Sequence, residues 1–340
     1  MNIYDIAELA GVSIATVSRV VNDSPKVSEK TKMKVRAVME ANHYTPNVFA
    51  RGLGLNSMKT VGIVCPDVSD DYMAGSVAYL EKRLRSYGYD CILYCSGYEY
   101  EDKAAAVHLI LQKRIDALFL VGSHYAGNGS GEDVDYVREA ADTILVFLIN
   151  GYVRCPGVYC VLSDNYQAVY DAVSALTETG KKGILFLYDS NSYSTMEKMR
   201  GYEDALKDNG ISVTEDRKIF VQNKILTVRD MLLEKKDLEF DAVAATDDGL
   251  AIGALKYARK KKLSVPGDIS IIGFNNSELS ICCEPELSSI DSRSETLCKT
   301  AVDSMMALLK GRPVRHKKVV PCRLVKRRTT NFYYMEGKRS

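Results

Sequence analysis

From Thr60 onward, short apolar runs alternate regularly with amphipathic segments, and this alternation limits the possible folds more than any other feature. Runs such as 117–121 and 145–148 contain no polar residue, which is typical of strands buried on both faces of a parallel sheet. About 250 residues are more than one such sheet commonly needs, so we expect two α/β lobes. The expected strands include 61–64, 91–94, 117–121, 145–148, 184–187, 242–244 and 269–272, and the expected helices lie near 73–87, 101–113, 166–180, 196–209, 226–236 and 249–262.

The first forty residues have a different pattern, which predicts three short helices. Ile3, Ile6, Ala7 and Ala10 fall on one helical face. A second run extends from Ile14 to Asn22, and a third begins after Ser28, a residue type that caps helix N-termini well. These helices predict a small separate head.

The turn between the first two predicted helices has the spacing of a helix-turn-helix. Ala7 lies where the helices would cross, Gly11 suits a turn with positive φ, and Ser13 can cap the second helix. The outward residues of the second helix are small, polar or basic, which suits entry into a DNA major groove. A plain three-helix structural bundle is the alternative. These outward residues are Ile14, Ala15, Ser18, Arg19 and Asn22.

The net charge of +1 conceals a segregation of charge along the chain. Residues 1–59 hold eight Lys/Arg and five Asp/Glu, whereas residues 60–309 hold 26 Lys/Arg and 38 Asp/Glu. Residues 310–328 hold nine Lys/Arg and no acid. A basic module on an acidic body indicates that one end meets a polyanion, although a modest basic excess also occurs on ordinary solvated faces.

Composition and motifs exclude several other classes. Apolar residues make up 46% and charged residues 26%, as in globular proteins, and no uncharged apolar run approaches a membrane span. The start lacks the pattern of a signal peptide, so we expect a cytoplasmic protein. The nine cysteines show no Cys-x-x-Cys spacing and the four histidines are scattered. No P-loop, Gly-x-Ser-x-Gly or dinucleotide motif occurs, so we expect no enzyme activity, metal or cofactor.

Residues 1–57 resemble the DNA-binding head of the lac repressor (LacI/GalR) family, and the body resembles the periplasmic-binding-protein-like core of that family. The resemblance covers essentially the whole chain. The stretches that carry it are 4–7, 11–13, 16–22, 27–31, 44–47 and 50–53 in the head, and 62–69, 200–202, 248–255, 265–274 and 324–330 in the body.

The resemblance implies a homodimer that represses transcription from a near-palindromic operator and associates with the nucleoid. It implies a head at 1–46, a hinge helix and linker at 47–59, and a core at 60–340. Lobe 1 would hold about 60–161 and 292–320, and lobe 2 about 162–291 and 321–340. The implied DNA-binding residues are Tyr4, Ser13, Ile14, Ala15, Thr16, Ser18, Arg19, Asn22, Ser28, Thr31, Tyr44, Asn47, Ala50, Arg51 and Leu53.

In the hinge, the resemblance implies that the segment becomes helical on DNA and that Leu53 enters the minor groove. Gly52 and Gly54 would each cost about 1 kcal/mol in a helix interior, so the isolated segment is a weak helix. An apolar side chain on such a segment suits insertion between base steps. The alternative is a flexible linker with an incidental leucine.

The resemblance also implies an effector in the cleft between the lobes. Here Lys198, Asp247 and Asn275 occupy positions where the family usually has Arg, Asn and Asp, so the preferred ligand should differ. We expect Lys198 and Asp247 to pair in the empty cleft, and a charged effector, with an anion slightly preferred because of residues 310–328. The predicted effector-binding residues are Tyr72, Met73, Asp164, Lys198, Asp247 and Asn275.

Several alternatives stay open. Tyr72 could stack on a sugar or pack as a rim residue, and Asp164 could bind a ligand or cap a helix. Residues 310–328 could recruit an anionic partner or form a solvated crossover. The core could have lost small-molecule binding and respond to a protein or to nothing. More distant alternatives are a sugar-binding transport protein and an enzyme.

Overall fold

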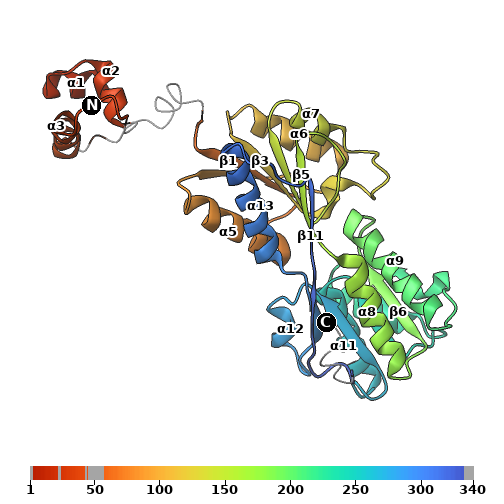
Figure 1. The fold of residues 1–340 in the computed structure, drawn as a ribbon. Coiled ribbons are helices and arrows are strands. Elements are labelled where there is room, and N and C mark those ends of the chain that lie inside the picture. Colours follow the sequence, from red (N-terminus) through yellow and green to blue (C-terminus); the bar gives the residue numbers. More distant parts are fainter. Residues whose placement is uncertain (1–2, 22–23, 43, 45–56, 333–340) are drawn as a thin grey trace, which may run out of the picture.

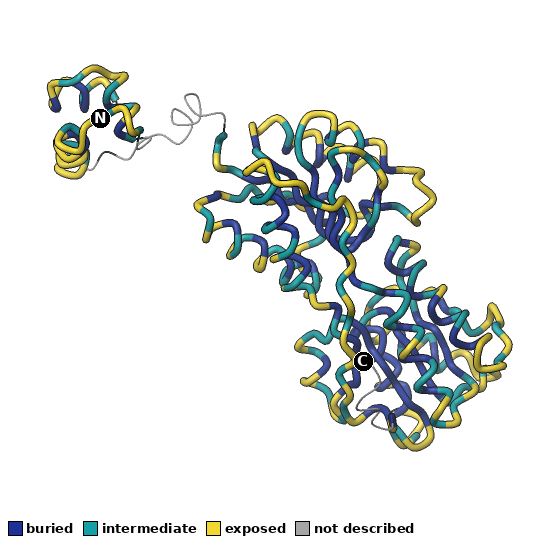
Figure 2. Tube along the Cα trace, viewed as in Figure 1, coloured by how far each residue is buried: buried dark blue, intermediate teal, exposed yellow. Residues whose placement is uncertain are grey.

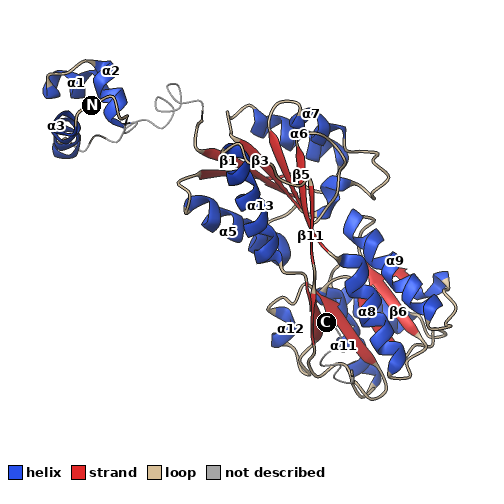
Figure 3. Ribbon diagram, in the orientation of Figure 1, coloured by secondary structure: helices blue, strands red, loops and turns tan. Residues whose placement is uncertain are grey.

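A computed structural model of the chain describes residues 3–21, 24–42, 44 and 57–332. The head contains the three expected helices, packed around a small apolar core of Ile6, Ala10, Val17 and Val35 (Figures 1 and 3). The helices are α1 (Ile3–Ala10), α2 (Ile14–Val21) and α3 (Glu29–Ala41).

Lobe 1 is built on a six-stranded sheet with strand order β11-β5-β4-β3-β1-β2, in which all neighbours pair in parallel. Helices α5 and α13 cover one face and α6 and α7 cover the other, so the central strands are buried on both sides (Figure 2). Its elements are β1 (Thr60–Cys65), α5 (Asp71–Arg85), β2 (Asp90–Cys95), α6 (Tyr100–Leu111), β3 (Ala117–Val121), η1 (Ser123–Ala126), α7 (Asp135–Ala141), β4 (Leu145–Ile149), β5 (Val158–Ser163), α13 (Ser294–Leu309) and β11 (Lys317–Val320).

Lobe 2 repeats this plan with strand order β12-β10-β9-β8-β6-β7, where only β12 runs antiparallel to its neighbour. Helices α8 and α9 cover one face and α10 and α11 the other. Its elements are α8 (Asn165–Glu178), β6 (Ile184–Tyr188), α9 (Tyr193–Asp208), η2 (Glu215–Arg217), β7 (Lys218–Phe220), α10 (Ile225–Glu234), β8 (Ala242–Ala245), α11 (Asp248–Lys261), β9 (Ser270–Phe274), α12 (Leu279–Cys282), β10 (Ser288–Asp291) and β12 (Arg323–Val325).

The chain crosses between the lobes three times, after β5, after β10 and after β11. Hydrogen bonds tie these crossovers together. The Asp164 amide donates to the Val320 carbonyl at 2.9 Å, and the Ser163 hydroxyl donates to the Ser292 carbonyl at 2.7 Å. The connection is therefore narrow and ordered, as a hinge between two rigid bodies requires.

A glycine sets the closest helix contact in lobe 2. Gly201 in α9 faces the backbone of Tyr166 in α8, and a Cβ at this position would overlap the Tyr166 carbonyl oxygen. The contact holds α9 against α8 and so places Lys198, one turn earlier, beneath the cleft. Among the described helices, none is both long enough and apolar enough to span a bilayer.

Candidate DNA-binding surface and interlobe cleft

The turn between α1 and α2 has the geometry that its residues predict. Gly11 has φ +60°, and the amide of Val12 donates to the carbonyl of Ala7 at 3.0 Å. Ala7 is buried in the apolar core of the head, as its predicted place at the helix crossing requires. The sharp turn fixes α2 across α1, which is the arrangement of a helix-turn-helix.

Ser13 caps α2 and leaves one face of that helix open. The Thr16 amide donates to the Ser13 hydroxyl oxygen at 3.2 Å, and the two hydroxyls lie 2.9 Å apart. Beyond the cap, Ile14 is 41% exposed, and Ala15 and Arg19 are exposed as well. Arg19 therefore presents its guanidinium to solvent on the same side of α2 as the other exposed residues.

The other predicted contacts in the head have more varied positions. Ser28 caps α3 by accepting from the Thr31 amide at 3.3 Å, so both residues have a structural role there. Tyr4 is 66% exposed, Ser18 is half-buried, and Tyr44 packs partly against the head core. Asn22, Asn47, Ala50, Arg51 and Leu53 lie outside the described residues.

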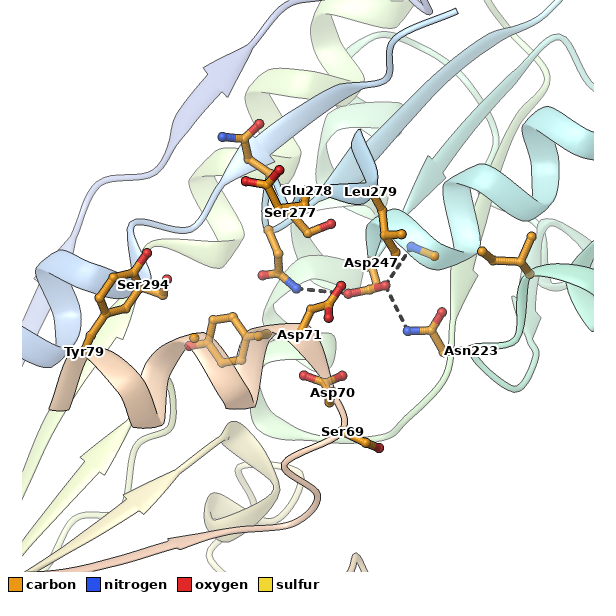
Figure 4. Close-up of a pocket in the computed structure, with 16 residues that line it drawn as sticks. Ser69, Asp70, Asp71, Tyr79, Asn223, Asp247, Ser277, Glu278, Leu279 and Ser294 are labelled. Atoms are coloured by element: carbon orange, nitrogen blue, oxygen red, sulfur yellow. Dashed lines mark hydrogen bonds between the residues drawn. The ribbon is translucent and has the colours of Figure 1, made fainter. Parts of the chain in front are cut away.

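The cleft lies between the N-terminal end of α5 in lobe 1 and the strand ends of lobe 2. Its outer cavity has a volume of about 490 Å³, within the range of small-molecule sites. Figure 4 shows the carboxylates of Asp70 and Asp71 facing Asp247 across it. A narrow inner cavity of about 70 Å³ continues inward and reaches Lys198 and Thr246. In such folds, ligands bind outside the carboxyl ends of the strands, and this cleft lies at that place.

Asp247 has neutral partners, and the expected pair with Lys198 is wrong. Its carboxylate accepts from Asn223 at 2.9 Å, from Asn275 at 3.0 Å and from the Gly249 amide at 2.8 Å. The last bond caps α11, because Asp247 is the N-cap residue. Strand ends β8 and β9 place Asp247 and Asn275 side by side, so the amide satisfies the carboxylate without a countercharge.

Lys198 is instead held by a carbonyl and an aromatic ring. Its ammonium donates to the Thr246 carbonyl at 2.9 Å and lies 3.6 Å from the ring centroid of Phe274. Only 5% of the residue is exposed. Burial lowers the pKa of Lys198 to about 8, although Asp247 and Asp189 oppose this shift. The charge is therefore stabilised by a cation–π contact and by nearby carboxylates without a direct ion pair.

The remaining predicted cleft residues divide into lining and structural ones. Tyr72 lines the outer cavity while its ring packs against the lobe 1 core, and burial raises its pKa. Met73 is 6% exposed and lines the inner cavity. Asp164 accepts from the Gln167 amide at 3.2 Å and caps α8, and it lines neither cavity.

Sequence reasoning missed many residues that line the cleft, among them Asp189, Asn150, Tyr98 and His124. Asp189 follows β6 and Asn150 follows β4, so the rule that sites gather at strand ends could have found both. Asp189 is partly buried, and this burial together with nearby Asp247 raises its pKa to about 6.

The basic stretch 310–328 does not supply cations to the cleft. It forms the edge strand β11, the last crossover and strand β12, and none of its residues lines the outer or inner cavity. Residues 310–328 therefore match the alternative of a solvated crossover. The positive charge of this stretch gives no reason to prefer an anionic effector.

Comparison with known proteins agrees with this two-part structure. Residues 2–47 match "Bacterial regulatory proteins, lacI family", and residues 173–330 match "Periplasmic binding protein-like domain". An HTH-type transcriptional regulator of Lachnoclostridium phytofermentans is 48% identical over 98% of this chain and 100% of its own length. Catabolite control protein A of Priestia megaterium is 31% identical over 85% of this chain and 87% of its own.

A solved structure has the same fold over nearly the full length. The lac repressor dimer bound to operator and the anti-inducer ONPF aligns with a TM-score of 0.85 and 26% identity, covering 97% of this chain and 98% of that one. The head, the two lobes and the sequence relatives lead to one conclusion. The chain belongs to the lacI family of bacterial transcriptional regulators.

Proposed function

We propose that the protein is a dimeric repressor that acts in the cytoplasm on chromosomal DNA, reads a near-palindromic operator through α2 and responds to a ligand in the interlobe cleft. The observation that carries this proposal is the open face of α2, where Ile14, Ala15 and Arg19 are all exposed behind a capped turn. The lac repressor structure in the comparison is itself a dimer on its operator.

The side chains on this face define how bases are read. Ile14 and Ala15 are apolar and suit contact with thymine methyl groups, whereas Arg19 can donate to guanine or to a phosphate. The polar residues around them suit phosphate contacts that set the register of the head on DNA. Two heads in a dimer would read half-sites about one helical turn apart.

The cleft and the narrow hinge support the regulatory part. A ligand that contacts both lobes favours one angle between them, because its affinity differs between the open and closed arrangements. The three hydrogen-bonded crossovers allow such a rotation while each lobe stays intact. The head is attached to lobe 1, so a change of lobe angle in the dimer would alter the spacing of the two heads. The relatives are transcriptional regulators, which favours regulation over catalysis.

Selection of bound sequences from a random pool of duplex DNA by the full-length protein tests the proposal. We expect a palindrome with two similar half-sites. Ile14→Glu should abolish enrichment, because a carboxylate on the open face of α2 would meet the DNA. Met33→Glu is the matched control, since Met33 is 64% exposed on α3, and it should keep the same consensus. Recovery of no consensus by the wild-type protein would overturn the proposal.

A further inference from the structure

The walls of the cleft are strongly acidic. Asp70 and Asp71 come from the start of α5, Asp247 precedes α11, and Asp189 follows β6. The carboxylates of Asp70, Asp189 and Asp247 lie close enough to interact: Asp247 raises the pKa of both Asp70 and Asp189, in addition to the larger effect of burial. The negative charges of these carboxylates therefore repel one another.

Several polar groups that line this cleft have no hydrogen-bond partner among the described residues, including the Tyr72 hydroxyl, His124 Nδ1 and the Thr246 hydroxyl. Among the residues that the structure describes, no other residue forms a hydrogen bond to the Asp189 carboxylate, whereas Asp70 caps α5 and Asp247 has three donors. Thr246 is only 4% exposed, and its buried hydroxyl, beside the inner cavity, has no hydrogen-bond partner. A buried polar group without a partner costs about 1–3 kcal/mol, so the Thr246 hydroxyl would gain from a hydrogen bond to a ligand in this cavity.

Lys198 acts on the carboxylates of the cleft without forming an ion pair: its charge lowers the pKa of Asp189, against the larger effect of burial. Its ammonium lies at the inner end, bonded to the Thr246 carbonyl and resting on Phe274. Asp70, Asp189 and Asp247 line the same inner cavity as Lys198, so an anionic ligand near Lys198 would also meet these carboxylates. Among the described residues, no lysine, arginine or histidine lines the outer cavity.

The mouth of the cleft also contains an aromatic side chain, that of Tyr98. Tyr98 is 46% exposed and lines the mouth of the cleft together with three carboxylates and one ammonium group, those of Asp67, Asp70, Asp189 and Lys224. The rings of Tyr98 and His124 meet edge to face with centroids 4.9 Å apart. Burial and nearby Lys103 lower the pKa of His124 to about 4, so this imidazole adds no positive charge at neutral pH. A tyrosine ring beside carboxylates is a favourable setting for an organic cation.

We propose that the effector is a small hydroxylated organic ammonium compound, such as an amino sugar, with its ammonium group between Asp70, Asp189 and Asp247 and a hydroxyl group bonded to the Thr246 side chain. This inference rests on the proposed function, because it names the class of ligand for the same cleft. The ammonium relieves the mutual repulsion of the carboxylates, and it supplies the donors that Asp189 lacks. No cluster of three ligating side chains fit for a metal occurs in the described part of the chain, which favours an organic cation over a metal ion.

Calorimetric titration of the full-length protein with matched compounds tests this inference. The probes are glucosamine and galactosamine, the N-acetylated form of each, glucose and galactose, glucose 6-phosphate, spermidine and Mg²⁺. We expect at least one amino sugar to bind ten-fold or more tightly than its N-acetylated and neutral counterparts. Spermidine, which lacks hydroxyls, and Mg²⁺ should bind more weakly than that amino sugar. Tighter binding of a neutral sugar, the sugar phosphate, spermidine or Mg²⁺, or binding of no amino sugar, would overturn the inference.

Two variants assign the effect to the cleft. Asp189→Asn should weaken binding of the amino sugar at least ten-fold, whereas Asp237→Asn, an exposed aspartate on the surface of lobe 2, should leave it unchanged. Equal binding to wild type and Asp189→Asn would place the ligand elsewhere and overturn the assignment.

The pH dependence provides a separate check. Burial and, to a lesser extent, nearby Asp247 raise the pKa of Asp189 to about 6, although Lys198 opposes this shift. Binding of an ammonium compound should therefore weaken as the pH falls through that value and Asp189 loses its negative charge. Affinity that is constant across this range would contradict a role for the Asp189 carboxylate. Operator binding measured in parallel separates the two proposals. An amino sugar that binds the cleft without changing operator affinity would confirm the ligand class and refute the regulatory function.

Discussion

Asn275 donates a 3.0 Å hydrogen bond to Asp247, and this amide–carboxylate contact takes the place that we expected Lys198 to fill. Both residues follow buried strands whose ends lie side by side in the sheet of lobe 2. Because Asp247 is satisfied by amides, the charge of Lys198 is left inside the lobe with only a carbonyl and an aromatic ring in contact.

Lys198→Met should therefore change how stability depends on pH. The pKa of Lys198 is lowered from 10.5 to about 8 in the folded protein, so its ammonium form is disfavoured there. The wild type should gain stability as the pH rises from about 8 toward 10.5, on the order of 1–3 kcal/mol, while Lys198→Met should not. Urea denaturation at several pH values measures the difference. Lys113→Met, at an exposed lysine, is the control. If the difference in free energy of unfolding between Lys198→Met and wild type does not change with pH, as expected for the control, the effect of burial on Lys198 is contradicted.

Gly201→Ala should destabilise lobe 2, because the added methyl would overlap the Tyr166 carbonyl oxygen. We expect the free energy of unfolding to fall by about 1–3 kcal/mol, as for other overpacked interiors. Gly75→Ala is the matched helical control: its Cβ would have nothing closer than 3.9 Å, so it should be neutral or stabilising by about 0.5–1 kcal/mol. Equal effects of the two substitutions in chemical denaturation would refute the close contact.

Arg19→Ala should reduce discrimination at one base position of the operator by about 1–3 kcal/mol if the guanidinium reads a base edge. The side chain is exposed on α2, which leaves it available for this role. Affinities for single-base variants of the operator, measured by fluorescence anisotropy, provide the comparison. Uniform weakening across all variants would show that Arg19 holds only a phosphate.

Leu53→Ala should remove most of the DNA bend while leaving the lobes folded. The reason is the resemblance of 47–59 to a hinge helix, in which an apolar side chain unstacks a base step. Energy transfer between dyes at the ends of the operator measures the bend, and circular dichroism checks the fold. The same DNA bend angle with the variant and the wild type would contradict insertion of Leu53 between base steps.

Most strands and helices of the body were predictable, because the apolar pattern of their sequences matches the burial of their side chains. The run 117–121 has no polar residue and forms the fully buried β3, and the six helices predicted in the body correspond to α5, α6, α8, α9, α10 and α11. Helix α13 and strand β11 were not among the predicted elements, although the resemblance assigned residues 292–320 to lobe 1. Their sequences alone do not show which sheet they join. In β11, Lys317 and Lys318 give an edge strand a polar pattern that differs from that of a buried strand.

The cleft was predictable only in part, for a similar reason. Lys198, Asp247 and Asn275 do line one inner cavity, as expected, but their hydrogen bonds depend on strand register and on Asn223, which lies in a loop between β7 and α10. Asp189 was missed although it directly follows a strand end. The net charge of a segment, such as 310–328, does not reveal which way its side chains point.

The most direct test of the regulator is the affinity of the full-length wild-type protein for its selected palindrome, compared with a scrambled duplex of the same length and composition. Fluorescence anisotropy at physiological salt should give a ratio of about 10³ or more in favour of the palindrome, because specific contacts add to the shared phosphate attraction. Affinity for both duplexes should fall steeply as salt increases. Equal affinity for the palindrome and the scrambled duplex would contradict sequence-specific repression.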